Sequence, residues 1–258
     1  MGNTKIDSKQ GHWMLAKMGK KVLRPGGKEL TQKLIENLKI NSTDDVVEFA
    51  PGLGFTASIT LKSKPKTYTG IELNEEAANM LRKTIKGQDR KIIVGNAEDS
   101  TLNKSAYSKV YGEAMLTMQA DKRKSAIIRE AHRILKKGGL YGIHELSLQH
   151  ENISEEKKAD IQRQLAQLMN VNARPLTKSE WSELLENEGF KIIKIETTSM
   201  HLLEPKRLIN DEGFFRTLRI IFNILTHPVE RKRILHMRQI FREYQSHLNA
   251  ICITAEKK

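Results

Sequence analysis

The 258-residue sequence predicts an α/β fold in which helices cover both faces of a mainly parallel sheet. From residue 45 onward, short runs rich in β-branched residues alternate with helical patterns, which is typical of a parallel sheet. The first of these runs ends in a glycine-containing turn, and 38% of the residues are hydrophobic, which is enough for a core. The length fits one such domain with additions.

The predicted elements follow one another without an internal repeat. A helical N-terminal region over about residues 7–40 precedes the sheet. The predicted strands are 45–49, 67–73, 91–97, 108–116, 140–148, 190–199 and 248–255. The predicted helices are 56–62, 74–86, 121–136, 154–169, 177–188 and the helical stretch 205–247. We expect Asn74 to cap its helix, with Glu75 and Glu76 in the first turn, and Gly138–Gly139 to end the helix before them.

Composition excludes several classes of protein. No stretch approaches the roughly 18–20 apolar residues of a membrane-spanning helix, and the first ten residues lack the apolar core of a secretory signal. The lone Cys252 excludes a disulfide framework, and the eight histidines form no ligand pair with an acid, so no metal site is predicted. These features predict a cytoplasmic protein.

The net charge of +13 lies mostly in two segments. Residues 1–39 hold nine Lys and Arg against three acids, and residues 205–247 hold nine against four. This clustering predicts attraction for an anion: a nucleic acid, an acidic small molecule or a membrane surface reached peripherally. The alternative is two helical faces that are simply solvated.

The turn after the first strand predicts a ligand site. Its residues Gly52, Gly54 and Ala57 satisfy the G-x-G-x-x-G/A pattern of dinucleotide binding, and Glu72 stands 20 residues beyond Gly52, where a ribose-binding acid belongs. On this pattern alone, an NAD(P)-dependent dehydrogenase remains open, as does a turn without a ligand.

Three features favour a different cofactor. Glu48 would repel a pyrophosphate but suits a cationic, amino-bearing ligand, and Pro51 removes one amide from the loop. The run 129–140, ending Leu-Lys-Lys-Gly-Gly-Leu, precedes the fifth strand. Together with the glycine loop, Glu72 and the Gly-Asn-Ala-Glu segment 95–98, it resembles the class I S-adenosylmethionine-dependent methyltransferases, above all the small-molecule group that includes the ubiquinone/menaquinone-biosynthesis enzymes. The resemblance covers about residues 42–150 and, more weakly, 175–200.

The resemblance implies a Rossmann-like, doubly wound, mainly parallel sheet of seven strands, S-adenosylmethionine as the cofactor, and methyl transfer as the activity. It implies that Glu72 accepts hydrogen bonds from both ribose hydroxyls and that Leu73 packs on the adenine. Asn96 stands where the family usually has Asp, and Ala50 where it has the first glycine. The residues implied to contact the cofactor are Glu48, Ala50, Pro51, Gly52, Gly54, Glu72, Leu73, Asn96, Ala97, Glu98 and Met115.

Three acid–base residues are candidates for assisting the acceptor. Glu113 lies near the end of the fourth strand, and His144 and Glu145 lie on the fifth. In this architecture the acceptor binds beyond the carboxyl ends of these strands. Adjacent strand residues face opposite ways, so only one of His144 and Glu145 can point to a given side. The alternative for each is a hydrogen-bonded structural role.

The two basic segments are expected to act as a lid over the acceptor. The apolar stripe of Phe214, Phe215, Leu218 and Phe222 recurs at helical spacing, and His12 and Trp13 are expected to close the other side. The alternative is two ordinary amphipathic helices packed on the core. The expected divisions of a single domain are an N-terminal cap (1–40), the cofactor-binding core (41–150), the rest of the core (151–204), the lid (205–247) and the last strand and tail (248–258).

The favoured function is methyl transfer to a small, largely apolar acceptor that carries an anionic group. An RNA or other nucleic-acid methyltransferase is the alternative that the basic segments suggest. Against it, the fourth strand ends in Glu-Ala-Met-Leu without an Asn/Asp-Pro-Pro-aromatic segment, and the aromatic content is only 5%. The acceptor and the oligomeric state are left open by the sequence.

Overall fold

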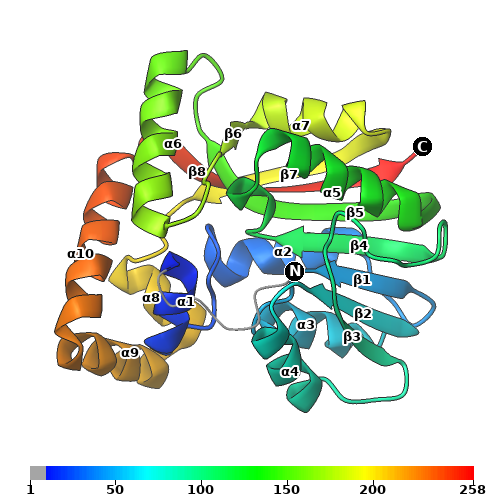
Figure 1. Ribbon diagram of the computed structural model, residues 1–258, viewed down its shortest axis with the longest axis horizontal. Coiled ribbons are helices and arrows are strands. Elements are labelled where there is room, and N and C mark those ends of the chain that lie inside the picture. Colours follow the sequence, from blue (N-terminus) through cyan, green and yellow to red (C-terminus); the bar gives the residue numbers. More distant parts are fainter. Residues whose placement is uncertain (1–9) are drawn as a thin grey trace.

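The computed structural model describes residues 10–258, and its centre is a twisted sheet (Figure 1). The strands are β1 (Asp45–Phe49), β2 (Thr67–Glu72), β3 (Arg90–Val94), β4 (Tyr107–Glu113), β5 (Leu135–Leu148), β6 (Leu176–Thr177), β7 (Phe190–Ser199) and β8 (Leu248–Lys257). Their order is β3-β2-β1-β4-β5-β8-β7, with the two-residue β6 beside β5. The strands from β3 to β5 run parallel, whereas β8 is antiparallel to both neighbours. The predicted mainly parallel, Rossmann-like fold is confirmed.

Helices cover both faces of this sheet. They are α1 (Gly11–Lys17), α2 (Gly27–Leu38), α3 (Phe55–Thr60), α4 (Glu75–Thr84), α5 (Asp121–Ile134), α6 (Glu155–Met169), α7 (Lys178–Asn187), α8 (Pro205–Glu212), α9 (Phe214–Thr226) and α10 (Pro228–Glu243), with 3₁₀ turns η1 (Leu61–Ser63) and η2 (Leu116–Met118). One core lies between the sheet and α2, α3 and α4, and the other between the sheet and α5 and α7. Within the described part of the chain, each helix is too short or too polar to span a bilayer.

A third apolar cluster lies beyond the carboxyl ends of the strands. It joins α1, α6 and α10 to the last residues of β5 and the first of β8. In Figure 1 these helices, with α8 and α9, form the left side of the molecule, next to the sheet rather than on its faces. These helices therefore lie beyond the carboxyl ends of the strands. The strand order reverses between β1 and β4, and α/β sheets bind ligands outside the carboxyl ends of the strands at such a point.

The connection between α1 and α2 is held by two carboxylates of α8. Asp211 accepts from the amide of Lys28 at 2.9 Å, and Glu212 accepts from the amides of residues 21–22 at 2.8 and 2.9 Å. The buried ammonium of Lys20 lies 3.8 Å from Asp211 and 3.7 Å from Glu212. These contacts fix the path of the connection, which forms one wall of the cavity described below.

Several boundaries differ from the predicted ones. The stretch 205–247 is three helices, because Gly213 and Pro228 interrupt it. The helix predicted to reach residue 136 ends at Ile134, because Leu135 is fully buried and pairs with Tyr107 of β4. The predicted N-terminal helix is two helices, and residues 7–9 of it lie outside the described residues. The predicted cap Asn74 is confirmed, since its side chain accepts from the Ala77 amide at 2.9 Å.

Candidate functional site

A cavity of about 450 Å³ opens at the carboxyl ends of β1, β2 and β4. Its size is in the usual range for small-molecule and cofactor sites. The sheet-side wall includes Ala50, Pro51, Gly52, Glu72, Leu73, Asn96, Ala97 and Met115. The opposite wall includes His12, Trp13, Lys21, Leu23, Arg24, Pro25, Leu146, Leu165, Met169, Val171, Leu202 and Phe241. The two additions and the end of the sheet thus enclose one space.

The glycine loop lies directly against this cavity. Ala50 and Gly52 have positive φ angles of 52° and 57°, so the chain turns sharply after β1. A Cβ added to Gly52 would meet only the Ala50 carbonyl oxygen, at 4.0 Å, so the glycine leaves open space on the cavity side. A ligand can therefore approach the backbone closely at Gly52.

Glu72 is a buried residue on the cavity wall, and its carboxylate can still accept hydrogen bonds from a ligand. Its two oxygens each accept one backbone amide, from Gly52 and from Asn74, both at 2.9 Å. Each oxygen keeps a further lone pair for a ligand. Burial raises the pKa of Glu72, while the amides of Asn74, Gly52 and Leu73 act in the opposite direction. The carboxylate is thus held in place to receive two donors, such as a pair of hydroxyls.

Glu48 does not line the cavity, contrary to its implied role. Side chains alternate along β1, and Glu48 points under the sheet toward α2, α3 and α4. There it accepts hydrogen bonds from the hydroxyls of Tyr68, at 2.6 Å, and Tyr111, at 2.7 Å. Burial raises its pKa to about 7, despite these hydrogen bonds. Glu48 is a buried structural acid, and it leaves the cavity wall to its neighbours in the loop.

Two other implied contacts also lie off the cavity wall. Gly54 has φ +78° and a Cβ there would lie 2.8 Å from Leu81 of α4, so this glycine serves helix packing. Glu98 pairs with Arg123. Leu73, Asn96, Ala97 and Met115 do lie on the wall.

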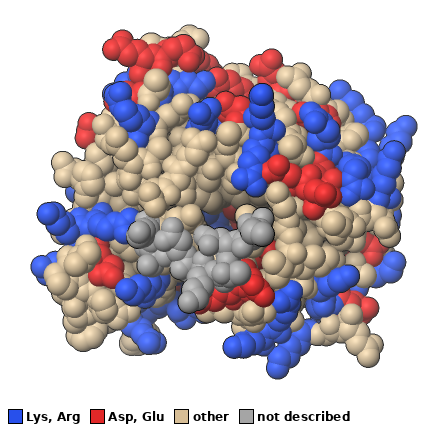
Figure 2. Space-filling model, in the orientation of Figure 1, with Lys and Arg blue, Asp and Glu red and all other residues tan. Residues whose placement is uncertain are grey.

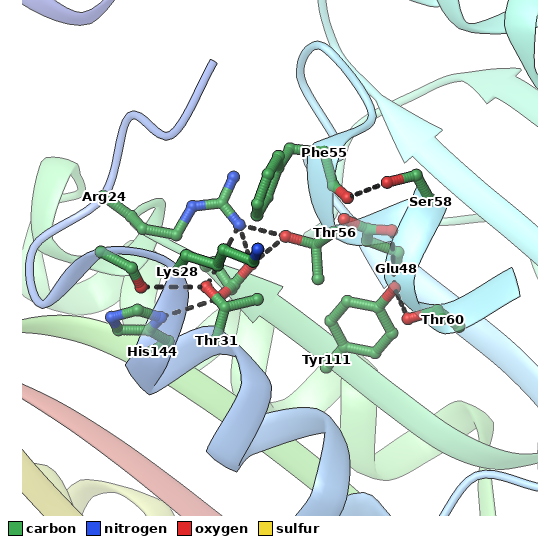
Figure 3. A network of polar contacts seen from close by, with 12 residues as sticks. Arg24, Lys28, Thr31, Glu48, Phe55, Thr56, Ser58, Thr60, Tyr111 and His144 are labelled. Carbon is green, nitrogen blue, oxygen red and sulfur yellow. Dashed lines mark hydrogen bonds and ion pairs between the residues drawn. The ribbon is translucent and has the colours of Figure 1, made fainter. Parts of the chain in front are cut away.

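Glu113 is the shared partner of four side chains in a buried polar network, and Figure 3 labels these four: Arg24, Thr31, Thr56 and His144. One oxygen accepts from Thr31 of α2 at 2.7 Å and contacts His144 of β5 at 2.7 Å. The other receives Arg24, from the connection before α2, and Thr56 of α3. Burial alone would raise the pKa of Glu113, but Arg24 and His144 outweigh it and lower the pKa to about 2. A carboxylate so stabilised is a weak base.

The ring of His144 is occupied on both sides. Glu113 and His144 are register partners on β4 and β5, so they face the same side of the sheet. Nδ1 lies 2.7 Å from Glu113, and Nε2 lies 2.5 Å from the Pro25 carbonyl oxygen. Both ring nitrogens thus lie against groups of the fold, and His144 does not line the cavity.

Glu145 faces the opposite side of the sheet and is also fully engaged. It accepts from the backbone amides of Met115, Leu116 and Thr117 at 2.8 to 3.0 Å, and from the Thr117 hydroxyl at 2.7 Å. It is completely buried and does not line the cavity. Its role is to fix the turn after β4, which positions Met115 and Thr117 on the wall. Of the three predicted catalytic candidates, only Glu113 touches the cavity.

The predicted lid divides into two parts. His12 and Trp13 of α1 lie on the cavity wall, with their rings 5.0 Å apart. The stripe on α9 does not cover the cavity, because α9 packs through the opposite side, where Thr217 and Ile220 are buried. The stripe residues Phe214, Phe215, Leu218 and Phe222 are 49 to 85% exposed. The expectation that they close over the acceptor is wrong.

The connection between α1 and α2 is part of the site, which was not predicted from the sequence. Arg24 and Pro25 bring a guanidinium and a carbonyl to the network, and Arg24 also lies over the ring of Phe55, 5.0 Å from its centre. The one local signal is the sequence Arg-Pro-Gly-Gly, which breaks the helical pattern before α2. Among residues 10–258 there is no group of three or more metal-ligating side chains.

Comparison with known proteins matches the part of the chain that builds the sheet-side wall. A family model described as a methyltransferase domain matches residues 47–143. An uncharacterized protein of Haemophilus influenzae is 34% identical over 254 residues, which is 96% of this chain and 98% of that protein, so the two belong to one family. Phosphoethanolamine N-methyltransferase of Plasmodium falciparum is 20% identical over 221 residues, covering 78% of this chain and 82% of that protein.

Solved structures share the whole architecture. Phosphoethanolamine N-methyltransferase 2 of Haemonchus contortus, solved with phosphomonomethylethanolamine and S-adenosylhomocysteine, gives a TM-score of 0.72 at 14% identity, over 95% of this chain and 58% of that one. The cyclopropane synthase MmaA2 of Mycobacterium tuberculosis gives 0.64 at 13% identity, over 89% and 83%. At these identities the likeness establishes a common fold.

The buried acid Glu48 predicts a specific pH dependence of stability. Its pKa is about 7 when folded, against 4.5 for the free side chain, so its contribution is fully present below pH 4.5 and is lost as the pH rises through about 7. We expect the free energy of unfolding to fall by about 3 kcal/mol more over this range in the wild type than in Glu48→Gln. Urea unfolding of both proteins at several pH values measures this difference. If the free energy of unfolding fell equally with pH in both proteins, Glu48 would not be the group responsible, and the raised pKa assigned to it would be contradicted.

Proposed function

Because the chain belongs to the class I S-adenosylmethionine-dependent methyltransferases, we propose that it methylates a small, largely apolar acceptor that carries an anionic group. The observation that supports this acceptor is the wall opposite Glu72. It is built mainly from Leu, Met, Val and Phe side chains of β5, α6, α10 and the connections before α2, after α6 and before α8, with Lys21 beside them. The finer resemblance to the quinone-biosynthesis enzymes stays a prediction.

The sheet-side wall fits the cofactor. Glu72 offers two carboxylate lone pairs for the ribose hydroxyls, and the open side of Gly52 accommodates the part of the ligand nearest the loop. Leu73 is 45% exposed although it lies on the cavity wall, which suits packing against a flat base. Asn96 already accepts the Glu98 amide at 3.1 Å, so its carbonyl oxygen is oriented. When bound, the cofactor supplies a methyl group activated by a sulfonium.

We propose that the chain promotes transfer by positioning the acceptor and excluding water. Glu113 is fully hydrogen-bonded with a lowered pKa, His144 lies between two acceptors, and Glu145 is buried away from the cavity. An acceptor suited to this site brings an available lone pair of its own, as a carboxylate, an amine or an acidic hydroxyl does.

Lys21 provides the cation for the anionic group of the acceptor. Its side chain is exposed at the cavity, and no described residue forms an ion pair with it. Arg24, the neighbouring cation, is already neutralised by Glu113. Arg238 and Arg242 of α10 do not serve this purpose, because both pair with Glu204, at 3.0 and 2.7 Å.

Neither of the two alternative functions, a nucleic-acid methyltransferase and an NAD(P)-dependent dehydrogenase, gains support. The basic helix α10 uses two of its arginines in the pairs with Glu204, so they are not free for the backbone of a nucleic acid. The comparisons identify methyltransferases, which removes the basis for a dehydrogenase.

A mutation at Glu72 tests the cofactor contact. Glu72→Ala should weaken binding of S-adenosylhomocysteine by about 1.5–3 kcal/mol, because charged hydrogen bonds to the ribose are lost. Isothermal titration calorimetry measures the affinity. The matched control is Glu75→Ala, which removes an exposed acid at the start of α4, three residues after Glu72. Tight binding of NADH together with no binding of S-adenosylhomocysteine would overturn the cofactor assignment.

A panel of acceptors, together with a mutation at Lys21, tests the acceptor class. With methyl-labelled cofactor, we expect transfer to members of a panel of apolar carboxylic acids and phenols, and none to RNA. Lys21→Gln should raise KM for the anionic acceptors about three- to fivefold at low salt without changing kcat, since an exposed ion pair is lost. Lys62→Gln, an exposed lysine on η1 away from the cavity, is the control. Labelling of RNA, or an equal KM in Lys21→Gln, would contradict the proposal.

A further inference from the structure

We propose that α9 is a docking helix for an anionic lipid surface. Six large apolar residues of this 13-residue helix are between 42 and 85% exposed, and no described residue covers them. They are Phe214, Phe215, Leu218, Ile221, Phe222 and Leu225. Val229, at the start of α10, extends the surface and is 71% exposed. We call these seven residues the α9 face.

The α9 face is a continuous stripe rather than a scatter of exposed residues. Five of its members recur at spacings of three and four, which places them on one side of the helix. The side that packs on the protein is different: Ile220 lies against the α1–α2 connection, and Asn223 donates to the Met18 carbonyl oxygen at 3.0 Å. None of residues 10–258 therefore covers the α9 face, and exposure of such an apolar stripe to water is unfavourable unless an external partner covers it.

The charge around the α9 face favours an anionic partner. Lys206, Arg219, Arg231 and Lys232 are exposed and form no ion pair with any of residues 10–258. The nearby acids are engaged: Glu230 pairs with Lys17 at 2.9 Å, and Glu212 holds the α1–α2 connection. Figure 2 shows Lys and Arg side chains beside uncharged surface in the lower left corner, where Figure 1 places α9. Apolar side chains with flanking unpaired cations are typical of helices that lie in the membrane interface.

This pattern distinguishes a lipid surface from the other possible partners. In a two-fold dimer through α9, the same unpaired cations of both copies would approach one another, which is unfavourable. A nucleic acid would satisfy the cations, but it offers nothing to Leu218, Ile221 and Leu225, which are aliphatic and cannot act as stacking platforms. An anionic membrane surface satisfies both the apolar stripe and the charges.

Vesicle co-sedimentation of the full chain tests this proposal. Vesicles of phosphatidylcholine with roughly one third phosphatidylglycerol should bind the wild type, and those of phosphatidylcholine alone should bind it less. The double variant Phe215→Ser/Phe222→Ser should lower the partition coefficient at least about tenfold, and Arg219→Gln/Lys232→Gln should lower it on the anionic vesicles. The matched controls at α4 and just after it, Met80→Ser and Lys83→Gln/Lys86→Gln, should bind as the wild type does.

Unchanged affinity for S-adenosylhomocysteine in every variant shows that the fold is intact, because α9 is remote from the cofactor wall. Absence of wild-type binding to the anionic vesicles, or equal binding by the wild type and the two α9 variants, overturns the proposal. Analytical ultracentrifugation provides an independent test. A wild-type dimer that Phe215→Ser/Phe222→Ser converts to a monomer would assign the α9 face to a second copy of the chain and overturn lipid docking.

Discussion

The buried ion pair between Arg24 and Glu113 ties the N-terminal segment to the sheet, and the site depends on it. The Glu113 carboxylate receives contacts from the α1–α2 connection, α2, α3 and β5 while itself lying on β4. Removing one partner of such a pair leaves the other buried and uncompensated, which is far more costly than losing a surface ion pair. The wall that carries Lys21 and Leu23 is therefore assembled only when the ends of β4 and β5 are in place.

The same contacts explain why acids at strand ends need not be catalytic. Side-chain alternation sends Glu48 and His144 toward the helices below the sheet and Glu145 to the other side. Each is satisfied there by hydroxyls, amides or a carbonyl oxygen, as buried polar groups must be. At the cavity itself, Glu113 is already engaged, whereas Glu72 can still accept hydrogen bonds from the cofactor, and a largely apolar wall faces the acceptor. Methyl transfer suits such a site, because the cofactor carries the reactivity.

Local patterns predicted the features that local physics determines. Alternating runs predicted the strands, Asn74 was predicted as a cap, and the spacing from Gly52 to Glu72 placed both on one cavity. The direction of Glu48 was not predictable, since a shift of one residue at the end of a strand reverses the side on which a side chain lies. The stripe on α9 was found, but amphipathicity does not say which face packs inward. Arg24 meets Glu113 across 89 residues, a contact that leaves no trace in either local sequence.

A double-mutant cycle on the free energy of unfolding tests most directly whether this ion pair organises the site. Arg24→Leu, Glu113→Gln and the double variant would be compared with the wild type by urea denaturation at neutral pH. If the two side chains form one buried unit, the loss in the double variant is smaller than the sum of the single losses by at least about 1.5 kcal/mol. Losses that add to within about 0.5 kcal/mol would show that the two residues act independently and would contradict the account.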